Sequence, residues 1–368
     1  MRILVIRLSA LGDVAMTVPV IDSVARRYPQ LEITVLSKPF VSPLFGQMPA
    51  NVRFQGVDVG RYKGAGGLFR LFRELKKERY DAVADLHDVL RSKLLRTLFA
   101  LCGTKTAHID KGRKEKKELT RARNKKLVPL TSSFKRYADV FRQLGFPVEA
   151  AFRSIYGEGK GEAGLFRAVT GLPDGKHWIG IAPFAAHAGK ILPESTLTKL
   201  IEEAASHKDR KIFLFGGGKA EAEKLERWSK PYDNVVSLAG KLKLSGELSL
   251  MSHLEVMVCM DSANMHLASL TGTPVVSVWG ATHPFAGFMG WGQSLDNAVQ
   301  TDLPCRPCSI FGNKPCLRGD YACLTEISAL FIGLIEDVGR IRVAMHEPLA
   351  VHGYKERGQG RSQPFVEV

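Results

Sequence analysis

The sequence predicts an α/β protein built from two doubly wound domains, each with a parallel sheet, that face a central cleft. The chain has 368 residues, which is long for one domain and ordinary for two. Short apolar runs alternate with amphipathic segments, the order expected when helices connect parallel strands. The same alternation restarts after the glycine-rich segment 157–164, which is therefore expected to lie near the domain boundary.

The first half contains several such segments in sequence order. The predicted elements are strands over 2–8, 33–36 and 81–85, and helices over 14–28 and 89–101. The apolar face of the last helix is expected to consist of Leu90, Leu94, Leu95 and Leu98.

The second half repeats the pattern. Strands are expected over 178–182, 211–215, 256–260 and 274–278, with helices starting at Pro193, after Gly216–Gly218, and over 262–271 and 325–345. Proline suits the first turn of a helix because its missing N–H has no partner there. The predicted division is an N-terminal domain over 1–160, a C-terminal domain over 161–324, a helix over 325–350 that would return to the N-terminal domain, and a polar tail over 351–368.

Positive charge is concentrated in the first half. The net charge is +15, but residues 1–160 hold 31 Lys and Arg against 15 Asp and Glu, while the remainder holds 21 against 22. This asymmetry predicts an anionic partner for the first half: nucleic acid, a phosphorylated glycolipid or an acidic membrane surface. Residues 105–126, with ten basic and three acidic side chains, are interpreted as a loop or surface helix that either contacts this partner or is simply solvated.

Composition limits the location of the protein. No run of eighteen apolar residues occurs, and the first residues read as a buried strand rather than a signal peptide, so we expect a cytoplasmic protein. Cys102 and Cys259 are expected to be reduced core residues. The remaining cysteines form a cluster that is either metal-binding or reduced: Cys305, Cys308, Cys316 and Cys323.

Three segments follow predicted strands, where open α/β sheets bind ligands. In the first, Ser9–Asp13, the carboxylate of Asp13 is either a helix N-cap or a proton acceptor. In the second, small residues precede Lys190, which is either a phosphate ligand or a surface lysine. In the third, Asp261 and His266 belong to a long polar run opening a helix, although either alone would more often be a cap or a core residue.

These segments resemble the signature of a known family. Residues 261–268 (DSANMHLA), 272–274 (GTP) and 279–284 (WGATHP) are similar to the pattern of glycosyltransferase family 9, as are 7–13 (RLSALGD), 81–92 and the loop with Gly189–Lys190 and Pro193–Glu194. The resemblance covers nearly the whole chain in order. Ala263 stands where glycine is usual in the family, and Leu192 stands where an aromatic residue is common.

The resemblance implies a GT-B fold and transfer of a heptose from ADP-heptose to the inner core of lipopolysaccharide, with inversion. It implies that Asp13 is the general base and that Lys190, with the backbone at Ser262 and Ala263, holds the diphosphate. Asp261 and His266 would complete the donor site, and Glu221 would meet the ribose. Because no Asp-x-Asp occurs, we expect neither a catalytic metal nor another cofactor.

In such a fold the basic half would bind the acceptor at the inner membrane. The expected acceptor-binding residues are Arg61, Lys63, Lys111, Arg113, Lys114, Lys116, Lys117, Arg121 and Arg123.

Three alternatives remain open from the sequence. The first is a transferase of the same fold with another nucleotide-sugar. The second is an NAD-binding oxidoreductase, suggested by Gly216–Gly218 but without an acidic residue about twenty positions on. The third is a nucleic-acid-binding protein, suggested by charge but without a matching motif.

Overall fold

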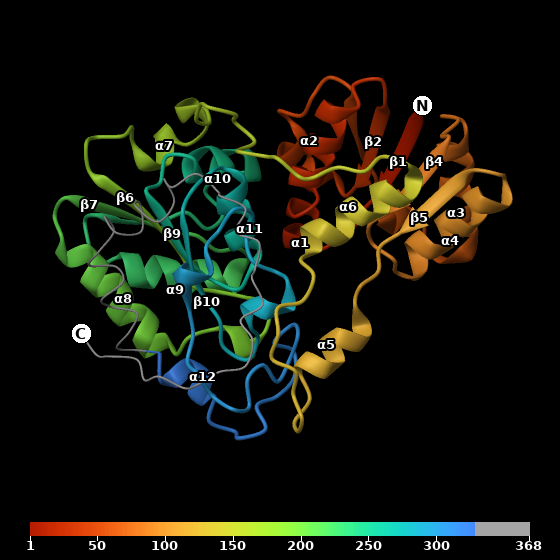
Figure 1. The fold of residues 1–368 in the computed structure, drawn as a ribbon. Helices are drawn as coiled ribbons and strands as arrows, with labels where there is room; N and C mark the ends of the chain where they lie inside the picture. The colour runs from red at the N-terminus through yellow and green to blue at the C-terminus, as the bar shows by residue number, and fades with distance from the viewer. Residues whose placement is uncertain (328–368) are drawn as a thin grey trace.

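The computed structural model describes residues 1–327, which form two parallel sheets in two lobes (Figure 1). The first sheet has the order β3-β2-β1-β4-β5. Its strands are β1 (Arg2–Ile6), β2 (Glu32–Ser37), β3 (Val52–Gly56), β4 (Ala82–Asp85) and β5 (Lys105–His108). The central strand is buried because helices cover both faces of the sheet, and Ile3 pairs with Ile33 on one side and Ala82 on the other.

The second sheet has the order β11-β10-β9-β6-β7-β8, also with parallel pairing throughout. Its strands are β6 (His177–Ala182), β7 (Arg210–Leu214), β8 (Val235–Ser237), β9 (Val256–Met260), β10 (Val275–Val278) and β11 (Ala298–Val299). Together the two sheets confirm the predicted architecture of two doubly wound, parallel-sheet domains.

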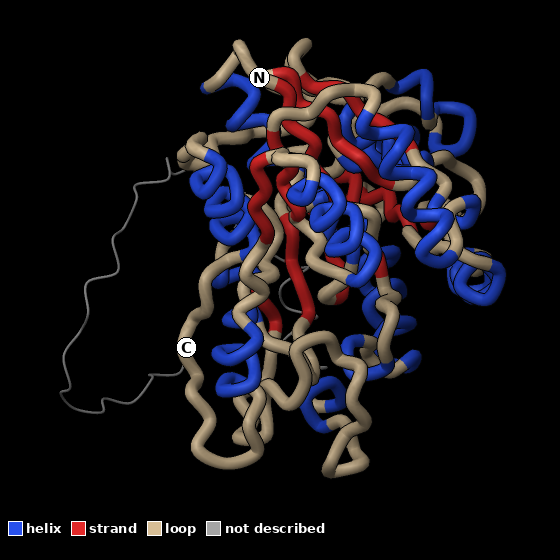
Figure 2. Tube along the Cα trace, turned by 90° about the vertical axis from the view of Figure 1, so that its right-hand side faces the viewer, coloured by secondary structure: helices blue, strands red, loops and turns tan. Residues whose placement is uncertain are grey.

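Helices connect the strands and flank both sheets (Figure 2). In the first half they are α1 (Leu11–Ala15), α2 (Val18–Arg27), α3 (Gly64–Lys76), α4 (Leu90–Leu101), α5 (Arg113–Leu119) and α6 (Ser133–Leu144). In the second half they are α7 (Arg167–Thr170), α8 (Glu194–Ser206), α9 (Lys219–Ser229), α10 (Leu244–Met251), α11 (Ala263–Leu270) and α12 (Ala322–Thr325).

The two halves pack against each other through α1 and α11. Gly12 of α1 is buried at this contact, and a Cβ atom there would lie 2.9 Å from the His266 ring and 3.2 Å from the Ala263 Cα. One hydrophobic cluster is shared across the contact and includes Val14 and Ala15 from the first half and Met265 and Leu267 from the second. Glycine at position 12 therefore allows the first turn of α1 to approach the first turn of α11.

The helix predicted over 14–28 is wrong in its start and its continuity. The chain forms α1 and α2 separately, and Pro19 lies in the first turn of α2. A continuous helix would place Pro19 where its missing N–H and its ring disrupt the preceding turn. Asp13 is accordingly not an N-cap: it is the third residue of α1, and its Oδ2 accepts a hydrogen bond from the backbone N–H of Ala10 at 3.3 Å.

Three further predictions in the first half need correction. Cys102, expected in the core, is exposed at the C-terminal end of α4, whereas Cys259 is buried as expected. Leu90 is 84% exposed, so the buried face of α4 is formed by Ser92, Leu95 and Phe99 instead. The basic segment 105–126 also begins with the edge strand β5, whose Ala107 is buried, before continuing as the surface helix α5. The strand is short and its exposed positions are charged or polar, so the alternation of buried and exposed residues could not be recognised from the sequence.

The remaining divisions of the chain stay predictions. Segment 157–164 lies after α6 and before β6, so it separates the two sheets along the chain. The domain boundaries at residues 160 and 324 stay predictions. The helix expected over 325–350 lies outside the described residues, except for its first three positions, and so does the tail over 351–368.

Candidate active site

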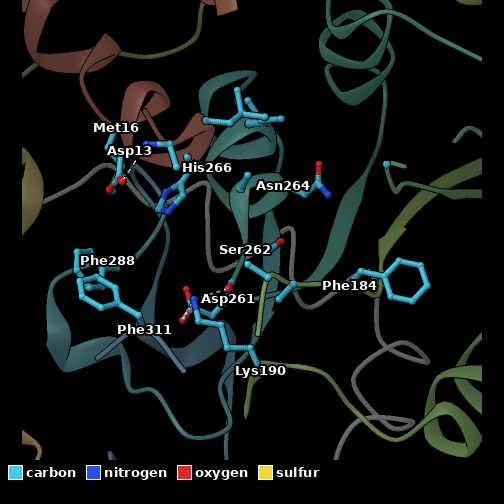
Figure 3. Close-up of a pocket in the computed structure, with 18 of the residues that line it drawn as sticks. Asp13, Met16, Phe184, Lys190, Asp261, Ser262, Asn264, His266, Phe288 and Phe311 are labelled. Atoms are coloured by element: carbon cyan, nitrogen blue, oxygen red, sulfur yellow. Dashed lines mark hydrogen bonds and ion pairs between the residues drawn. The ribbon is translucent and has the colours of Figure 1, made fainter. Parts of the chain in front are cut away.

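The three strand-following segments meet at one cavity of about 520 Å³ between the two halves (Figure 3). Asp13 reaches it from the first turn after β1, Lys190 from the loop after β6, and Asp261 from the end of β9. Parallel strands place their carboxyl ends at one edge of a sheet, and the two sheets turn these edges toward each other. The cavity is lined by all the residues predicted to form the base and the donor site: Asp13, Lys190, Glu221, Asp261, Ser262, Ala263 and His266.

Asp13 is held by one oxygen and free at the other. Its Oδ2 lies 2.6 Å from Nη2 of Arg7 and accepts the Ala10 N–H, while Oδ1 has no hydrogen bond or ion pair among the described residues. Arg7 is itself buried, and its Nη1 donates to the carbonyl oxygen of Leu86 at 2.7 Å. Arg7 therefore fixes the carboxylate and leaves one oxygen available to accept a proton.

Lys190 and Asp261 form a charged pair on the opposite wall of the cavity. The Lys190 Nζ lies 3.0 Å from Asp261 Oδ2 and donates to the Asp261 carbonyl oxygen, also at 3.0 Å. Gly312 packs on the lysine stem: it has a φ of +73°, and a Cβ there would lie 2.6 Å from the Lys190 Cγ. The lysine is thus held with its ammonium at the cavity, where it can contact phosphate oxygens.

The first turn of α11 supplies the other part of an anion site. Ser262 is the N-cap residue, and its buried hydroxyl has no hydrogen-bond partner in the described part of the chain. The N-terminus of a helix presents free N–H groups and a partial positive charge. The Ala263 Cβ lies 3.6 Å from the position that a Gly12 Cβ would occupy, so this methyl group points toward α1. Lys190 and the α11 N-terminus together form a site suited to a diphosphate.

His266 lies between Asp13 and Asp261 in the cavity (Figure 3). Burial lowers the pKa of His266 to about 4, so the imidazole is neutral at physiological pH. Its Nδ1 is buried and has no hydrogen-bond partner among residues 1–327. A neutral imidazole can bind a hydroxyl group of a ligand without adding a charge beside Lys190.

Glu221 approaches the cavity from the first turn of α9, after β7. Its Oε2 accepts the backbone N–H of Gly217 at 2.8 Å, which ties the carboxylate to the glycine loop. A Cβ at Gly216 would lie 2.8 Å from Cδ1 of Leu225 and 3.2 Å from this carboxylate, so a larger residue there would crowd both side chains. The start of the glycine run therefore packs against Glu221. A dinucleotide-binding fingerprint would also need an acidic residue about twenty positions further on, and the sequence has none there.

A second, basic cavity of about 680 Å³ adjoins the first. Its charged lining comprises Arg7, Lys111, Arg113, Lys116, Lys117, Arg136 and Lys314, with Asp13 as its acidic member. Burial lowers the pKa of Lys116 to about 8, and its Nζ lies 4.5 Å from the ring centroid of Phe288. Burial also lowers the pKa of His87 to about 4, so this imidazole adds no positive charge at neutral pH.

The two cavities share one wall. Its residues are Ala10, Asp13, Phe288, Ile310 and Phe311. The rings of Phe288 and Phe311 lie 5.9 Å apart, and Phe311 is 54% exposed. Asp13 is therefore the polar group at the place where ligands in the two cavities would meet.

The structure divides the predicted acceptor-binding residues into two sets. Four line the basic cavity: Lys111, Arg113, Lys116 and Lys117. Lys114 lies in a neighbouring cavity, while Arg121 pairs with Glu118 at 3.7 Å. The residues in the lining of neither the donor cavity nor the basic cavity are Arg61, Lys63, Lys114, Arg121 and Arg123.

Sequence reasoning missed several residues of these cavities. Arg7 is part of the R-x-S opening of the first motif, so the motif itself could have drawn attention to it. Phe288, Phe311 and Lys314 had no comparable signal, because they come from loops of the second half. Lys314 also shows that positive charge around the basic cavity is not confined to residues 1–160.

Within residues 1–327, the four clustered cysteines are not gathered into a set of metal ligands. All are free, and within residues 1–327 no group of three or more His, Cys, Asp or Glu side chains is arranged to hold a metal ion. Cys323 packs in the core of the second half, where burial raises its pKa to about 11. This arrangement favours reduced thiols over half of a zinc site, and the choice between the two stays a prediction.

We expect protein purified without chelators to contain zinc far below one equivalent per chain. Elemental analysis of the purified chain checks this, with free thiols counted in parallel under denaturing conditions. Stoichiometric zinc, lost when Cys305 and Cys308 are both replaced by Ser, would contradict the structure.

Two facing doubly wound sheets with a ligand cavity at the carboxyl ends of their strands define a two-domain enzyme of the GT-B class. The family model of glycosyltransferase family 9 (heptosyltransferase) matches residues 68–314. The chain belongs to this family and is a glycosyltransferase.

Relatives and solved structures agree with this assignment. The chain is 26% identical over 321 residues to lipopolysaccharide heptosyltransferase 1 of Pseudomonas aeruginosa, covering 84% of this chain and 86% of that protein. It is also 26% identical over 309 residues to lipopolysaccharide heptosyltransferase 3 of Escherichia coli K12, covering 78% and 84%. Its fold matches E. coli ADP-heptose LPS heptosyltransferase II at 20% identity with a TM-score of 0.66, covering 94% of this chain and 99% of that chain.

The structure of E. coli heptosyltransferase WaaC with ADP matches over 92% of this chain and 100% of that chain, at 20% identity and a TM-score of 0.63.

Within residues 1–327, no helix has the length and apolarity needed to cross a membrane.

Proposed function

We propose that this enzyme transfers a heptose from ADP-heptose to the inner core of lipopolysaccharide, with inversion at the anomeric carbon. The relatives named as lipopolysaccharide heptosyltransferases, and the matching structure with ADP, support this donor and acceptor. A nucleotide-sugar would occupy the cavity with Lys190, Glu221 and Asp261, and the acceptor would occupy the basic cavity.

The position of Asp13 on the shared wall is the observation that carries the proposal. The Oδ1 atom of Asp13 faces no partner among residues 1–327, while Arg7 fixes Oδ2. A carboxylate at this place can take the proton of an acceptor hydroxyl as its oxygen attacks the anomeric carbon. Attack from the side opposite the diphosphate gives inversion.

The departing diphosphate would be stabilised by Lys190 and the N-terminus of α11. As the bond between the anomeric carbon and the phosphate oxygen breaks, negative charge grows on that oxygen. The Lys190 ammonium, the N–H groups of the first turn and the Ser262 hydroxyl surround the place where this charge develops. These groups can carry the charge without a divalent metal, and metal independence is part of the proposal.

A donor screen tests this function directly. The enzyme is incubated with ADP-, UDP- and GDP-sugars and a lipid A acceptor carrying Kdo, with and without EDTA, and product is measured by mass spectrometry. We expect transfer from ADP-heptose with little effect of EDTA. If product forms only with another nucleotide-sugar, ADP-heptose is not the donor. Strong inhibition by EDTA would overturn metal independence.

The domain roles and the location follow from the same arrangement. We propose that the domain over 1–160 binds the acceptor, that the domain over 161–324 binds the donor, and that the protein acts in the cytoplasm at the inner membrane surface. The four lysine and arginine side chains of α5 and its N-terminal flank that line the basic cavity favour phosphates and carboxylates of a lipid-anchored acceptor. Each basic residue near an anionic surface contributes about 1 kcal/mol.

We expect replacement of Lys111, Arg113, Lys116 and Lys117 together by Ser to raise the acceptor KM and to weaken binding to anionic vesicles. The donor Kd should not change, because these residues line the basic cavity and not the donor cavity. Steady-state kinetics and vesicle co-sedimentation at two salt concentrations measure both effects, since salt screens exposed charges beyond roughly 8–10 Å.

A matched control removes the same charge elsewhere. Lys199, Lys208, Lys219 and Lys230 are exposed on the second half and lie outside both cavities. Replacing these four by Ser should leave the acceptor KM at its wild-type value. Equal losses in both quadruple variants would show that net charge, and not the basic cavity, attracts the acceptor.

A further inference from the structure

Glu247 is a carboxyl group in the donor cavity that the proposed reaction does not use. It lies in the first turns of α10, the helix that follows β8, and it lines the cavity together with Glu221 and Asn264. Neither the sequence motifs nor the proposed chemistry assigns it a role.

The Glu247 side chain has no hydrogen bond or ion pair among residues 1–327, although it is largely removed from solvent. Burial alone raises the pKa of its carboxyl to about 7, and no charged neighbour contributes to the shift. A partly buried carboxyl group that lacks a protein partner has lost much of its hydration without gaining a hydrogen bond in return. A group that faces a ligand cavity in this state is placed to bind a polar group of the ligand.

The order of the second sheet indicates which part of the donor lies near Glu247. Strands β9, β6, β7 and β8 are neighbours in that order, and the cavity follows their carboxyl ends. The proposed diphosphate site belongs to the loops after β9 and β6, and the transferred sugar lies toward Asp13. The part of the donor that extends toward β7 and β8 is therefore the nucleoside.

A carboxyl group selects hydrogen-bond donors and disfavours phosphate. In adenosine the available donors are the ribose hydroxyls and the exocyclic amino group of the base. Glu221, from the first turn of α9 after β7, is the carboxylate expected to meet the ribose. Glu247 comes from α10, the helix after the next strand of the sheet, β8.

We infer that Glu247 recognises the exocyclic amino group of the adenine base and so selects an adenine nucleotide as donor. The inference rests on the proposed function, because it assumes that a nucleoside diphosphate sugar occupies this cavity. A carboxyl oxygen accepts a hydrogen bond from the amino group whether or not the carboxyl is protonated.

The test compares ADP with inosine diphosphate, in which a carbonyl oxygen replaces the amino group. Isothermal titration gives the Kd of both nucleotides for wild type and for Glu247→Gln. Wild type should prefer ADP by roughly tenfold to a hundredfold, the range expected for one hydrogen bond to a charged or buried group. The glutamine amide can donate to the carbonyl oxygen, so Glu247→Gln should reduce or reverse this preference.

Glu223→Gln serves as the control, because Glu223 is an exposed carboxylate on α9 outside the cavity and should keep the wild-type preference. Glu247→Asp, which keeps the carboxyl on a shorter side chain, is measured as well. It should weaken the binding of ADP without strengthening the binding of inosine diphosphate. An unchanged preference in Glu247→Gln overturns the inference while leaving the proposed function intact. Failure of wild type to bind either nucleotide would instead reject the proposed donor.

Discussion

Asp13→Asn should abolish nearly all sugar transfer while the protein still folds and binds ADP. The asparagine keeps the size of the side chain but cannot take a proton, and loss of a general base typically lowers the rate by about 10²–10⁴. ADP affinity should be kept, because the predicted diphosphate ligands come from the other half of the chain. Single-turnover rates with ADP-heptose, and ADP binding by titration calorimetry, measure the two effects separately.

Because Asp13 forms an ion pair with Arg7, the substitution can change protein stability as well as the rate of transfer. Asparagine loses the 2.6 Å pair between Arg7 and Asp13, and Arg7 is buried, so a thermal melt must accompany the kinetics. Asp233→Asn, at an exposed aspartate outside the cleft, is the matched control and should have wild-type rates. Transfer by Asp13→Asn within a few-fold of wild type, at unchanged stability, would show that another group accepts the proton.

Lys190→Ala should weaken ADP-heptose binding and slow transfer together. The ammonium is proposed to contact the diphosphate both before transfer and while charge grows on the leaving oxygen. Removing one preorganised stabilising group typically costs about 10²–10³ in kcat. The variant also leaves the Asp261 carboxylate, whose side chain is 6% exposed, without its cation, and this should repel the diphosphate further.

Two controls separate these effects for Lys190. Lys208→Ala removes an exposed lysine just before β7, at the end of the sheet opposite the cleft, and should be kinetically silent. Lys190→Arg keeps the positive charge and should recover part of the ADP affinity if charge is what matters. Full activity in Lys190→Ala would mean that Lys190 serves only to neutralise Asp261.

Much of this enzyme follows from local features of the sequence. The strand over 256–260 and the helix that opens at Glu194 lie almost where their apolar patterns predict them, because buried parallel strands are short, continuous apolar runs. Lys190 and Asp261 could be expected at one edge of the second sheet, since each follows a strand of that sheet and parallel strands end at one edge. The family motif added the reaction to this geometry.

Local patterns failed where a neighbour in space decides the outcome. The apolar face of the predicted helix continues from α1 through Pro19 into α2. This continuity concealed the break that Pro19 indicates. The edge strand β5 is defined by its pairing with β4, since three of its own four residues are polar. Leu90 has helical spacing, yet no other element within residues 1–327 covers it.

The sequence by itself determined the architecture, the family and the residues at the strand ends, because those depend on short-range patterns and on the fixed direction of parallel strands. Only the tertiary structure decided which side chains share a cavity. Phe311 and Lys314 join the basic cavity from a loop of the second half, and Glu247 reaches the donor cavity from the helix after β8. The physical reason is that a ligand cavity is bounded by surfaces from distant segments, and the distance between those segments is set by how the two sheets pack.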